Sequence, residues 1–398
     1  MSLLEIINLA LLLGGTVLII PCVVFFLESV AAFWARTSIP KKQPLSRPKT
    51  TVLVPAHNEA AQIQPVLETV LQQLTPRDRL VVIADNCHDN TAELARATGA
   101  TVIERENLTH RGKGYALDYG MKFIQDDPPE VVVILDGDCI IAPHTIERIT
   151  TKAIATGRPV QSAYLMEQPE DPSLKDNVSM FAIQVKNLVR LLGLNRLGLH
   201  CLLTGSGMAF PWEIINRVSL AGSKTTDDMQ LTVDLALTGC TPVFCPEARV
   251  VGRLMKDQDA ASQRSRWEHG HLEMILVEIP RLLQAFVKTG RLSLLALALD
   301  IFIPPLSLLV MIWLAGMMMA AIAAIAGLTT TPAILMTVAG GFLFTGILLA
   351  WFKFGRSNLP LQNLFALPIY MLSKIPIYLN FVIKPQSRWL KTERDISE

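Results

Sequence analysis

Two aspartates separated by one glycine, Asp136 and Asp138, directly follow the apolar run Val131–Leu135. Mg2+ and Mn2+ take one or two protein carboxylates and keep their other positions for phosphate oxygens. Two carboxylates just past a buried strand therefore suit a divalent metal that carries a diphosphate. Because Asp-Gly is also common in turns, the pair alone is a weak signal.

Lys113 lies close by in the sequence and carries the opposite charge. It belongs to the stretch His110–Gly114, at the expected beginning of a helix. A helix N-terminus and a neighbouring cation both attract phosphate. A solvated basic loop has the same composition, so for Lys113 alone both interpretations stay open.

A second acidic pair, Asp227 and Asp228, precedes the predicted helix Met229–Leu237. An N-cap role, which contributes about 1 kcal/mol, accounts for one of these carboxylates but not for both. A carboxylate in such a position could also accept the proton of an attacking hydroxyl. The small residues Gly205–Gly207 would permit close approach by a substrate, although alone they indicate only a turn.

The stretch Gln263–Trp267 combines a guanidinium with an indole. Arg266 is suited to a diphosphate oxygen, and the face of Trp267 is suited to stacking on a sugar. The alternative is an Arg/Trp anchor beside the membrane. His269 and His271 would point to different faces of a helix, so we expect no metal site there.

The elements that position these residues alternate between strands and helices. Alternation of this kind predicts parallel βαβ units and an open α/β sheet, in which ligands bind beyond the carboxyl ends of the strands. The polar clusters His57–Glu59, Asp85–Asp89 and Asp136–Asp138 fall at those ends. The predicted strands are Thr51–Val54, Leu80–Ala84, Thr101–Glu104 and Val131–Leu135, and the predicted helices are Ala60–Gln73, Thr91–Thr98 and Gly114–Gln125.

Three apolar segments are long enough to cross a bilayer, which requires about 20 residues. They are Leu3–Ala35, Ile301–Ala326 and Pro332–Phe352. A signal peptide is a poor explanation of the first, because no basic region precedes it and no small-residue cleavage site follows it. Pro304-Pro305 should break or begin the second segment.

Basic residues follow the first and third segments, and the loop between the second and third has none. By the positive-inside rule we expect the N-terminus outside and both the central region and the tail in the cytosol. The apolar stretch Leu359–Val382 contains three prolines, and a fourth span would place the basic tail outside. An interfacial or re-entrant segment is therefore favoured, and Arg281–Arg291 is expected to form an earlier interfacial helix.

Composition excludes several other classes. A net charge of +1 gives no argument for nucleic-acid binding. The six cysteines form no CxxC pair and are typical of reduced thiols in a cytosol-facing domain. Asp300 is the only ionisable residue noted near a span and is expected at the interface. Without charge pairs within the spans, a transporter is a poor interpretation.

Taken in order, the motifs resemble the family-2 glycosyltransferases with the GT-A fold, and most closely the membrane-bound branch that includes cellulose and hyaluronan synthases. The resemblance covers roughly residues 48–290 and the flanking spans. The motifs that carry it are Pro55–Glu59, Asp85–Asp89, His110–Leu117, Asp136–Asp138, Gly205–Gly207, Asp227–Asp228 and Gln263–Trp267. It implies a Rossmann-like mixed sheet between N- and C-terminal transmembrane helices.

The resemblance also implies roles for individual residues. Asp228 would be the general base, with Asp227 beside it, and Asp138 would hold Mg2+ or Mn2+ together with Asp136. The nucleotide would be bound by Pro55, His57, Glu59, Asp85, Lys113 and Asp136. The acceptor and diphosphate would be bound by Gly205, Ser206, Gly207, Gln263, Arg266 and Trp267. Two positions depart from the family pattern, because Ala84 replaces a frequent second Asp and Asp227 replaces the usual Glu.

The resemblance implies three regions: a transmembrane helix in 1–36, a cytosolic GT-A domain in 37–290, and a membrane region with a basic tail in 291–398. The implied reaction is inverting transfer from a UDP-sugar to a growing polysaccharide at the cytosolic face of the plasma membrane. A synthase adding one sugar to a membrane lipid is the first alternative, and a non-catalytic nucleotide-sugar sensor is the second. Since three spans are few for a polymer channel, a homo-oligomer or a secretion partner is expected with a polymer. No linear motif identifies the sugar.

Overall fold

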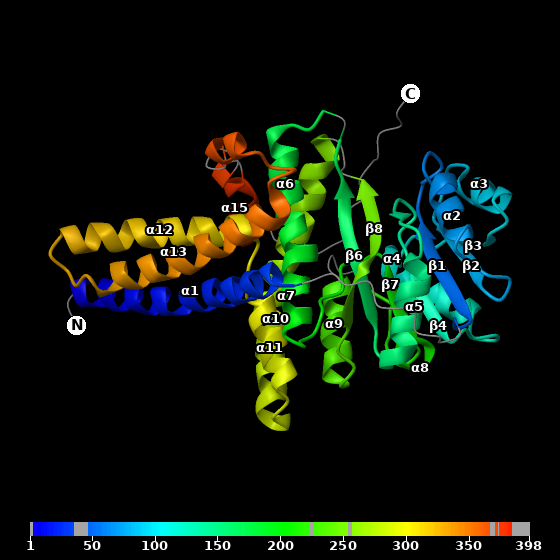
Figure 1. Cartoon of the computed structure of the whole chain (residues 1–398), viewed down its shortest axis with the longest axis horizontal. Coiled ribbons are helices and arrows are strands. Elements are labelled where there is room, and N and C mark those ends of the chain that lie inside the picture. Colours follow the sequence, from blue (N-terminus) through cyan, green and yellow to red (C-terminus); the bar gives the residue numbers. More distant parts are fainter. Residues whose placement is uncertain are drawn as a thin grey trace. The chain divides into compact units, whose positions relative to one another are not determined.

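The computed structural model describes residues 3–35, 47–169, 171–222, 227–253, 257–366, 371–372 and 374–383. The chain divides into two compact units, each drawn from several stretches of sequence (Figure 1). The first consists of Met1–Ala35, Pro172–Gly198 and His271–Pro385, and the second of Arg36–Asp171, Leu199–Gly270 and Gln386–Glu398. The first unit thus contains an insertion, Pro172–Gly198, that the sequence-based division placed in the 37–290 region.

The second unit is built on one mixed sheet, which has eight strands in the described part of the chain. Their order is β3-β2-β1-β4-β7-β6-β8-β5. The bounds are β1 Thr50–Ala56, β2 Arg79–Asp85, β3 Thr101–Arg105, β4 Val131–Ile134, β5 Ile140–Ile141, β6 Val160–Glu167, β7 Met208–Pro211 and β8 Val243–Arg253. Strands β1 to β4 pair in parallel, as predicted, whereas β7 is antiparallel to both β4 and β6.

The central strands are buried on both faces, because helices pack against each side of the sheet. Along β1, Val52 and Val54 contribute to one apolar cluster and Leu53 to the other. Buried residues of α2 join the first cluster, and those of α4 join the second. The helices of this unit are α2 Ile63–Leu71, α3 Thr91–Ala97, α4 Lys113–Phe123, α5 Thr145–Thr156, α8 Trp212–Ile215 and α9 Asp227–Leu237. This double coverage explains the continuous apolar runs of the parallel strands.

The first unit is helical in its described residues. Its helices are α1 Leu3–Phe33, α6 Leu174–Gln184, the π-helix η1 Val185–Val189, α7 Arg190–Arg196, α11 Leu292–Ile301, α12 Leu306–Ile325, α13 Thr331–Ala350, the π-helix η2 Trp351–Gly355, the 3-10 helix η3 Leu361–Ala366 and α15 Ile375–Ile383. Helix α10, Asp257–Thr289, contributes residues to both units. A capping box between Ser173 and Asp176 fixes the beginning of α6.

Three described helices are long and apolar enough to cross a membrane, and they correspond to the three predicted spans. They cover Glu5–Phe33, Leu306–Ile325 and Thr331–Gly355. The second begins later than Ile301, because Pro305 forms its N-cap and Ile301 ends the separate helix α11. Residues 367–370 and 373 lie outside the described part of the chain, so the interfacial placement of Leu359–Val382 stays a prediction.

The stretch Arg281–Arg291, predicted to form a helix, is helical up to Thr289 but belongs to a longer helix, and its interfacial placement stays a prediction. Residues up to Thr289 continue the 33-residue helix α10, and a new helix starts at Leu292. The break falls at Gly290, whose φ of +69° lies in the left-handed region that glycine adopts without steric cost. Sequence composition therefore located the break but not the beginning of the helix.

A buried ionic cluster, which the sequence analysis did not predict, joins α1, α7 and α11. Arg190 Nε lies 2.8 Å from Glu28 Oε2, and its Nη2 contacts both the carboxylate of Asp300 and, at 2.7 Å, the Asp300 backbone oxygen. Asp300, which was expected at the interface, is 1% exposed and therefore buried within the helical unit. Glu28 belongs to the first candidate span, and its partner Arg190 comes from a helix outside the three spans.

Two further contacts fix α1 inside the first unit. A Cβ on Gly193 of α7 would lie 2.1 Å from the backbone oxygen of Glu28, so this close approach requires glycine. The ammonium of Lys353 donates to the backbone oxygens of Ala32, Phe33 and Ala35 at 3.1, 2.7 and 2.9 Å. A cation at the last carbonyls of a helix satisfies acceptors that have no partner within the helix.

Candidate active site

The loop Asp136–Asp138 leaves the carboxyl end of β4, where the alternating topology predicts ligand binding. A Cβ on Gly137 would lie 3.4 Å from the Ala56 side chain and 3.5 Å from the Pro55 backbone oxygen, so the loop packs on the end of β1. The N–H of Asp136 donates to Ser206 Oγ at 3.0 Å. These contacts fix the loop while both carboxylates stay half-buried.

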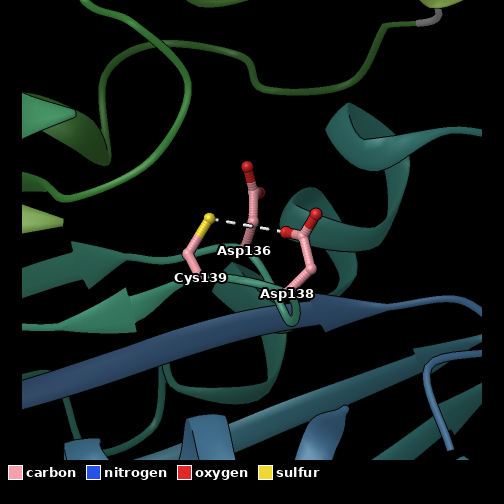
Figure 2. A group of neighbouring side chains, drawn as sticks. All are labelled: Asp136, Asp138 and Cys139. Atoms are coloured by element: carbon pink, nitrogen blue, oxygen red, sulfur yellow. Dashed lines mark hydrogen bonds between the residues drawn. The ribbon is translucent and has the colours of Figure 1, made fainter. Parts of the chain in front are cut away.

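Figure 2 shows Asp136, Asp138 and the thiol of Cys139 grouped together, with ligand atoms that all lie within 4.8 Å of one another. Burial raises the pKa of the Cys139 thiol well above its usual range, and the charges of Asp138 and Asp136 raise it further. Cys139 is therefore neutral, and its Sγ donates to Asp138 Oδ1 at 3.4 Å. The anionic ligands of the group are the two carboxylates, a donor set that fits the hard cations Mg2+ and Mn2+.

Lys113 heads α4, as predicted, directly after Gly112 with its φ of +120°. Its ammonium forms an ion pair with the Asp136 carboxylate and donates to the Gly205 backbone oxygen at 2.6 Å. Burial lowers the pKa of Lys113, but Asp136 and Asp228 more than offset this and raise it above its ordinary value. Lys113 is therefore a permanent cation between the two acidic groups.

Gly205 lies between Lys113 and Asp228. A Cβ at this position would be 3.6 Å from Asp228 Oδ2 and 4.0 Å from Lys113 Nζ. The φ of Gly205 is +95°, which side-chain-bearing residues rarely adopt. The glycine therefore brings bare backbone to the point where the cation and the carboxylate approach each other.

Asp227 and Asp228 form the first turn of α9, two residues earlier than the predicted beginning of that helix. The N–H of Met229 donates to Asp228 Oδ1 at 2.9 Å, while Asp228 Oδ2 faces Gly205. Asp227 lies on the other side, where its Oδ1 is 3.7 Å from the Cβ position of Gly222. The two carboxylates are therefore not equivalent, and Asp228 faces the remaining site residues.

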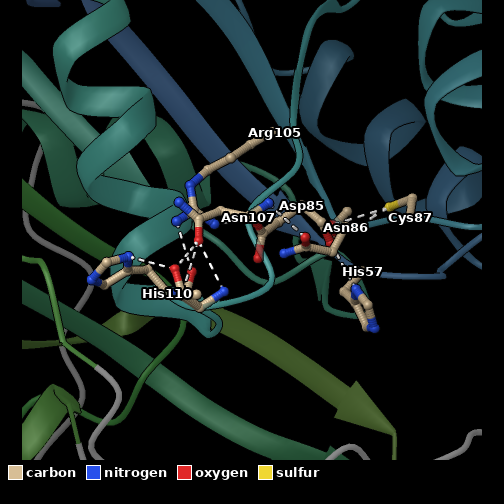
Figure 3. Close-up of polar contacts among 9 residues, drawn as sticks. His57, Asp85, Asn86, Cys87, Arg105, Asn107 and His110 are labelled. Atoms are coloured by element: carbon tan, nitrogen blue, oxygen red, sulfur yellow. Dashed lines mark hydrogen bonds and ion pairs between the residues drawn. The ribbon is translucent and has the colours of Figure 1, made fainter.

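A second polar group lies at the ends of β1, β2 and β3 (Figure 3). His57 Nδ1 donates to the Asp85 backbone oxygen at 2.7 Å, and the Asp85 carboxylate lies 2.5 Å from Arg105 Nη1. Both partners of this ion pair are about 10% exposed, at 9% and 10%. Asn86, in the left-handed region with a φ of +52°, accepts the N–H of Asn107 at 2.8 Å.

Arg105 was missed by the sequence analysis. A signal was present, because Asp85 and Arg105 are register partners at the ends of two neighbouring parallel strands. Its Nη2 also donates to the backbone oxygen of His110 at 2.7 Å, which links this group to the chain leading to Lys113. Glu59 is 9% exposed, and its backbone N–H donates to Thr91 Oγ1 at 2.8 Å.

The Gln263–Trp267 stretch lies in α10. Arg266 is buried and Trp267 is half-buried. The side chain of Gln263 lies outside the described part of the structure. The roles of these three residues toward diphosphate and acceptor stay predictions.

Comparisons with known proteins agree with this fold. A mannosyltransferase from Pyrobaculum calidifontis, solved in complex with GDP-Man and Mn2+, superposes with a TM-score of 0.56 over 96% of this chain and 100% of its own, at 19% identity. That likeness concerns the fold alone.

Two curated relatives are both named 4,4'-diaponeurosporenoate glycosyltransferase. The one from Staphylococcus haemolyticus is 26% identical over 183 residues, which are 44% of this chain and 46% of the relative. The one from Staphylococcus aureus (strain USA300) is 41% identical over 65 residues, which are 16% of this chain and 17% of the relative. The chain thus spans less than half the length of either relative. The model of the glycosyltransferase-like family 2 matches residues 48–270, more than half of the chain, and the chain belongs to that family.

Proposed function

We propose that this protein is a metal-dependent inverting glycosyltransferase that moves a sugar from a UDP-sugar to a growing polysaccharide at the cytosolic face of a membrane. One observation carries the proposal. Lys113 and Asp228 both lie within about 4 Å of the Cβ position of Gly205, and Lys113 is paired with Asp136 of the carboxylate loop. A cation suited to a leaving diphosphate and a carboxylate suited to a proton acceptor thus lie around one open backbone position.

The donor is assigned to the carboxylate loop and the ends of β1 to β3. Asp136 and Asp138 would hold Mg2+ or Mn2+, which supplies positive charge where negative charge develops on the departing diphosphate. Asp85, fixed by Arg105, and the neighbouring His57 and Glu59 would bind the nucleoside, with Pro55 at the end of β1. The donor of the Pyrobaculum mannosyltransferase is GDP-Man, so a guanine nucleotide is the alternative that the assay must include.

Transfer would take place in one displacement. Asp228 Oδ2 accepts the proton of the acceptor hydroxyl, whose oxygen then bonds to the anomeric carbon. The bond between that carbon and the diphosphate oxygen breaks at the same time, and UDP leaves with the electron pair. Because the acceptor enters opposite the leaving group, the configuration at the anomeric carbon is inverted. Lys113, and by resemblance Arg266, would stabilise the charge on UDP.

Two classes of acceptor are compatible with this site. The QxxRW motif of Gln263–Trp267 favours a polymer of the cellulose or hyaluronan synthase kind, with a homo-oligomer or a separate partner providing a wider path across the membrane. The curated relatives are named for 4,4'-diaponeurosporenoate and favour a second candidate, a synthase that adds one sugar to a small membrane acceptor. The two candidates differ in product length and not in the chemistry of the site.

The membrane placement rests on the first unit. Three of its described helices are suited to spanning a bilayer, and Lys353 at the end of the third binds the C-terminal carbonyls of the first. These two helix ends therefore belong to one side of the membrane. The basic residues that follow both ends favour the cytosolic side, with the N-terminus outside.

Nucleotide release tests the proposal. The detergent-purified chain is incubated with Mn2+, a candidate acceptor extract and a panel of UDP-sugars plus GDP-mannose, and the products are sized. Asp228→Asn should lower release about 10²- to 10⁴-fold, which is the usual contribution of a general base. Asp234→Asn, on the same helix and hydrogen-bonded to Gln230, is the matched control and should leave release unchanged.

The outcomes separate the candidates. Products of increasing length support the polymer, and a single glycosylated lipid supports the second candidate. Release that survives Asp228→Asn would overturn the assignment of the base. A chain that binds nucleotide but releases none from any donor would favour the non-catalytic sensor.

A further inference from the structure

Thr232 joins the helix of the proposed base to the loop that faces it. It lies one turn after Asp228 in α9 and is fully buried, with 0% exposure. Its hydroxyl donates to the Asp228 backbone oxygen at 3.0 Å and accepts the N–H of Leu203 at 2.9 Å. A hydroxyl has one proton and two lone pairs, so both bonds form together.

Gln161 holds the same loop from the opposite side. It lies in β6 and is also 0% exposed. Its Oε1 accepts the N–H of Thr204 at 2.9 Å, and its Nε2 donates to the backbone oxygen of Ser206 at 2.8 Å. The two bonds grip the chain immediately before and after Gly205. One buried side chain, that of Gln161, therefore holds the chain on both flanks of Gly205.

The loop held by Gln161 also contacts Asp136 and Lys113, which are assigned to donor binding. Ser206 Oγ accepts the N–H of Asp136, and the Gly205 oxygen accepts from Lys113. A displacement of the loop would thus change the distance between Asp228 and the groups assigned to the diphosphate. Neither Gln161 nor Thr232 exposes any surface, so neither touches a substrate.

We propose that Gln161 and Thr232 are positioning residues that fix the loop Thr204–Gly207 between the carboxylate loop and Asp228. The hydrogen bonds from Gln161 and Thr232 to the backbone set the distance at which an acceptor hydroxyl meets Asp228. They thereby favour transfer of the sugar to that hydroxyl over hydrolysis by water. Misplacement of about 1 Å costs on the order of 10²-fold in rate, so small shifts of this loop have large effects. This role rests on the proposed function, because it presupposes that Asp228 is the base.

Thr232→Val and Thr232→Ser test the proposal as a pair. Valine has the same shape and lacks the hydroxyl, whereas serine keeps both hydrogen bonds. Thr232→Val should lower kcat for transfer about 10- to 100-fold and raise the share of donor lost to hydrolysis. The Kd of UDP with Mn2+ should change less than about twofold, because the groups assigned to the nucleoside and the metal lie at the ends of β1 to β4, and Thr232→Ser should restore transfer.

Thr238→Val is the matched control for the loss of a hydroxyl. Thr238 directly follows α9, and its Oγ1 donates to the backbone oxygen of Leu235, within its own segment. This variant should leave the transfer-to-hydrolysis ratio unchanged. If Thr232→Val instead weakens nucleotide binding and thermal stability in step with kcat, and serine does not rescue it, Thr232 is only structural and the proposal is overturned.

Hydrogen exchange tests the bridge without any activity. In the full chain, the amide of Leu203 should exchange at least about tenfold faster in Thr232→Val, and that of Thr204 in Gln161→Met. Unchanged protection in both variants would refute the bridge itself. If the wild type transfers no sugar but the amides respond as expected, the proposed function fails and the bridge stands as a structural finding, without its assigned role.

Discussion

The two units each contain one cation placed between two carboxylates, but they use it differently. In the second unit Lys113 lies between Asp136 and Asp228, and the side chains of the Lys113–Asp136 pair are 31% and 27% exposed. In the first unit Arg190 lies between Glu28 and Asp300, at exposures of 6%, 2% and 1%. Water can therefore replace the partners of Lys113 but cannot reach those of Arg190.

This difference separates a site from a structural joint. An ion pair that stays in contact with solvent contributes about 0–1 kcal/mol to stability, so the half-buried Lys113 is able to exchange a partner for a ligand at small cost. Removing one member of a buried pair costs about 3–5 kcal/mol, because a charge is left without its partner. Burial lowers the pKa of the Arg190 guanidinium, but Glu28 and Asp300 more than offset this and raise it, so Arg190 is always charged.

Replacement of each cation by methionine tests the difference between the two groups most directly. Arg190→Met should lower the free energy of unfolding by about 3–5 kcal/mol, seen as a much lower thermal midpoint in detergent. Lys113→Met should leave that midpoint nearly unchanged and lower the rate of sugar transfer about 10²- to 10³-fold. Equal loss of stability in both variants would contradict the distinction between site and joint.

Two glycines of the first unit provide a further test, with a smaller expected effect on stability. A methyl group at Gly193 would meet the backbone of α1, so Gly193→Ala should cost about 1–3 kcal/mol through forced separation of α1 and α7. Gly341, inside α13, has nothing within 4 Å of its Cβ position. Gly341→Ala should therefore keep or slightly raise the thermal midpoint, and a loss equal to that of Gly193→Ala would show that the close approach is unimportant.

The smallest effect concerns a histidine beside the buried cluster. Burial and the nearby Lys186 and Arg190 lower the pKa of His271 to about 3. The unfolded chain binds a proton near pH 6.5 but the folded one does not, so stability is present above pH 6.5 and is lost as the pH falls toward 3. The loss should be about 1.4 kcal/mol for each pH unit below 6.5.

Denaturant unfolding at pH 7 and pH 5.5 measures this loss. His271→Gln keeps a donor for the Ile301 oxygen that the His271 ring contacts at 3.1 Å, and it should reduce the acid sensitivity. The matched control is His88→Gln, at an exposed position, which should leave the pH dependence as in the wild type. Equal acid sensitivity in all three proteins would contradict the assignment to His271.

The pattern of apolar and helical stretches predicted the parallel half of the sheet and the helices that connect its strands. The four strands of the parallel half and the helices between them were found because apolar runs alternate with helical stretches, and Lys113 and Asp228 were placed at helix beginnings for the same reason. The antiparallel β7 and the long β8 were not predicted, because their pairing depends on strands far away in sequence.

The buried joint escaped prediction for a related reason. Arg190 is 162 residues from Glu28 and 110 from Asp300, and no spacing rule connects them. An acidic residue at the end of an apolar segment was therefore assigned to the interface, where isolated charges are common. The partners of Asp85 and of the Gly205 loop were missed likewise, since Arg105, Gln161 and Thr232 carry no motif of their own.

The contact of Lys353 with the end of α1 has a consequence for biosynthesis. The bonded atoms are 318 to 321 residues apart in the chain, and Asn8 and Thr329, also 321 residues apart, are hydrogen-bonded as well. Ribosomes add about 5–20 residues per second, so tens of seconds pass between the synthesis of the last carbonyls of α1 and that of Lys353. During that interval other hydrogen-bond donors, water among them, must satisfy these carbonyls. Completion of the third apolar helix is thus the step that releases α1 from its temporary partners.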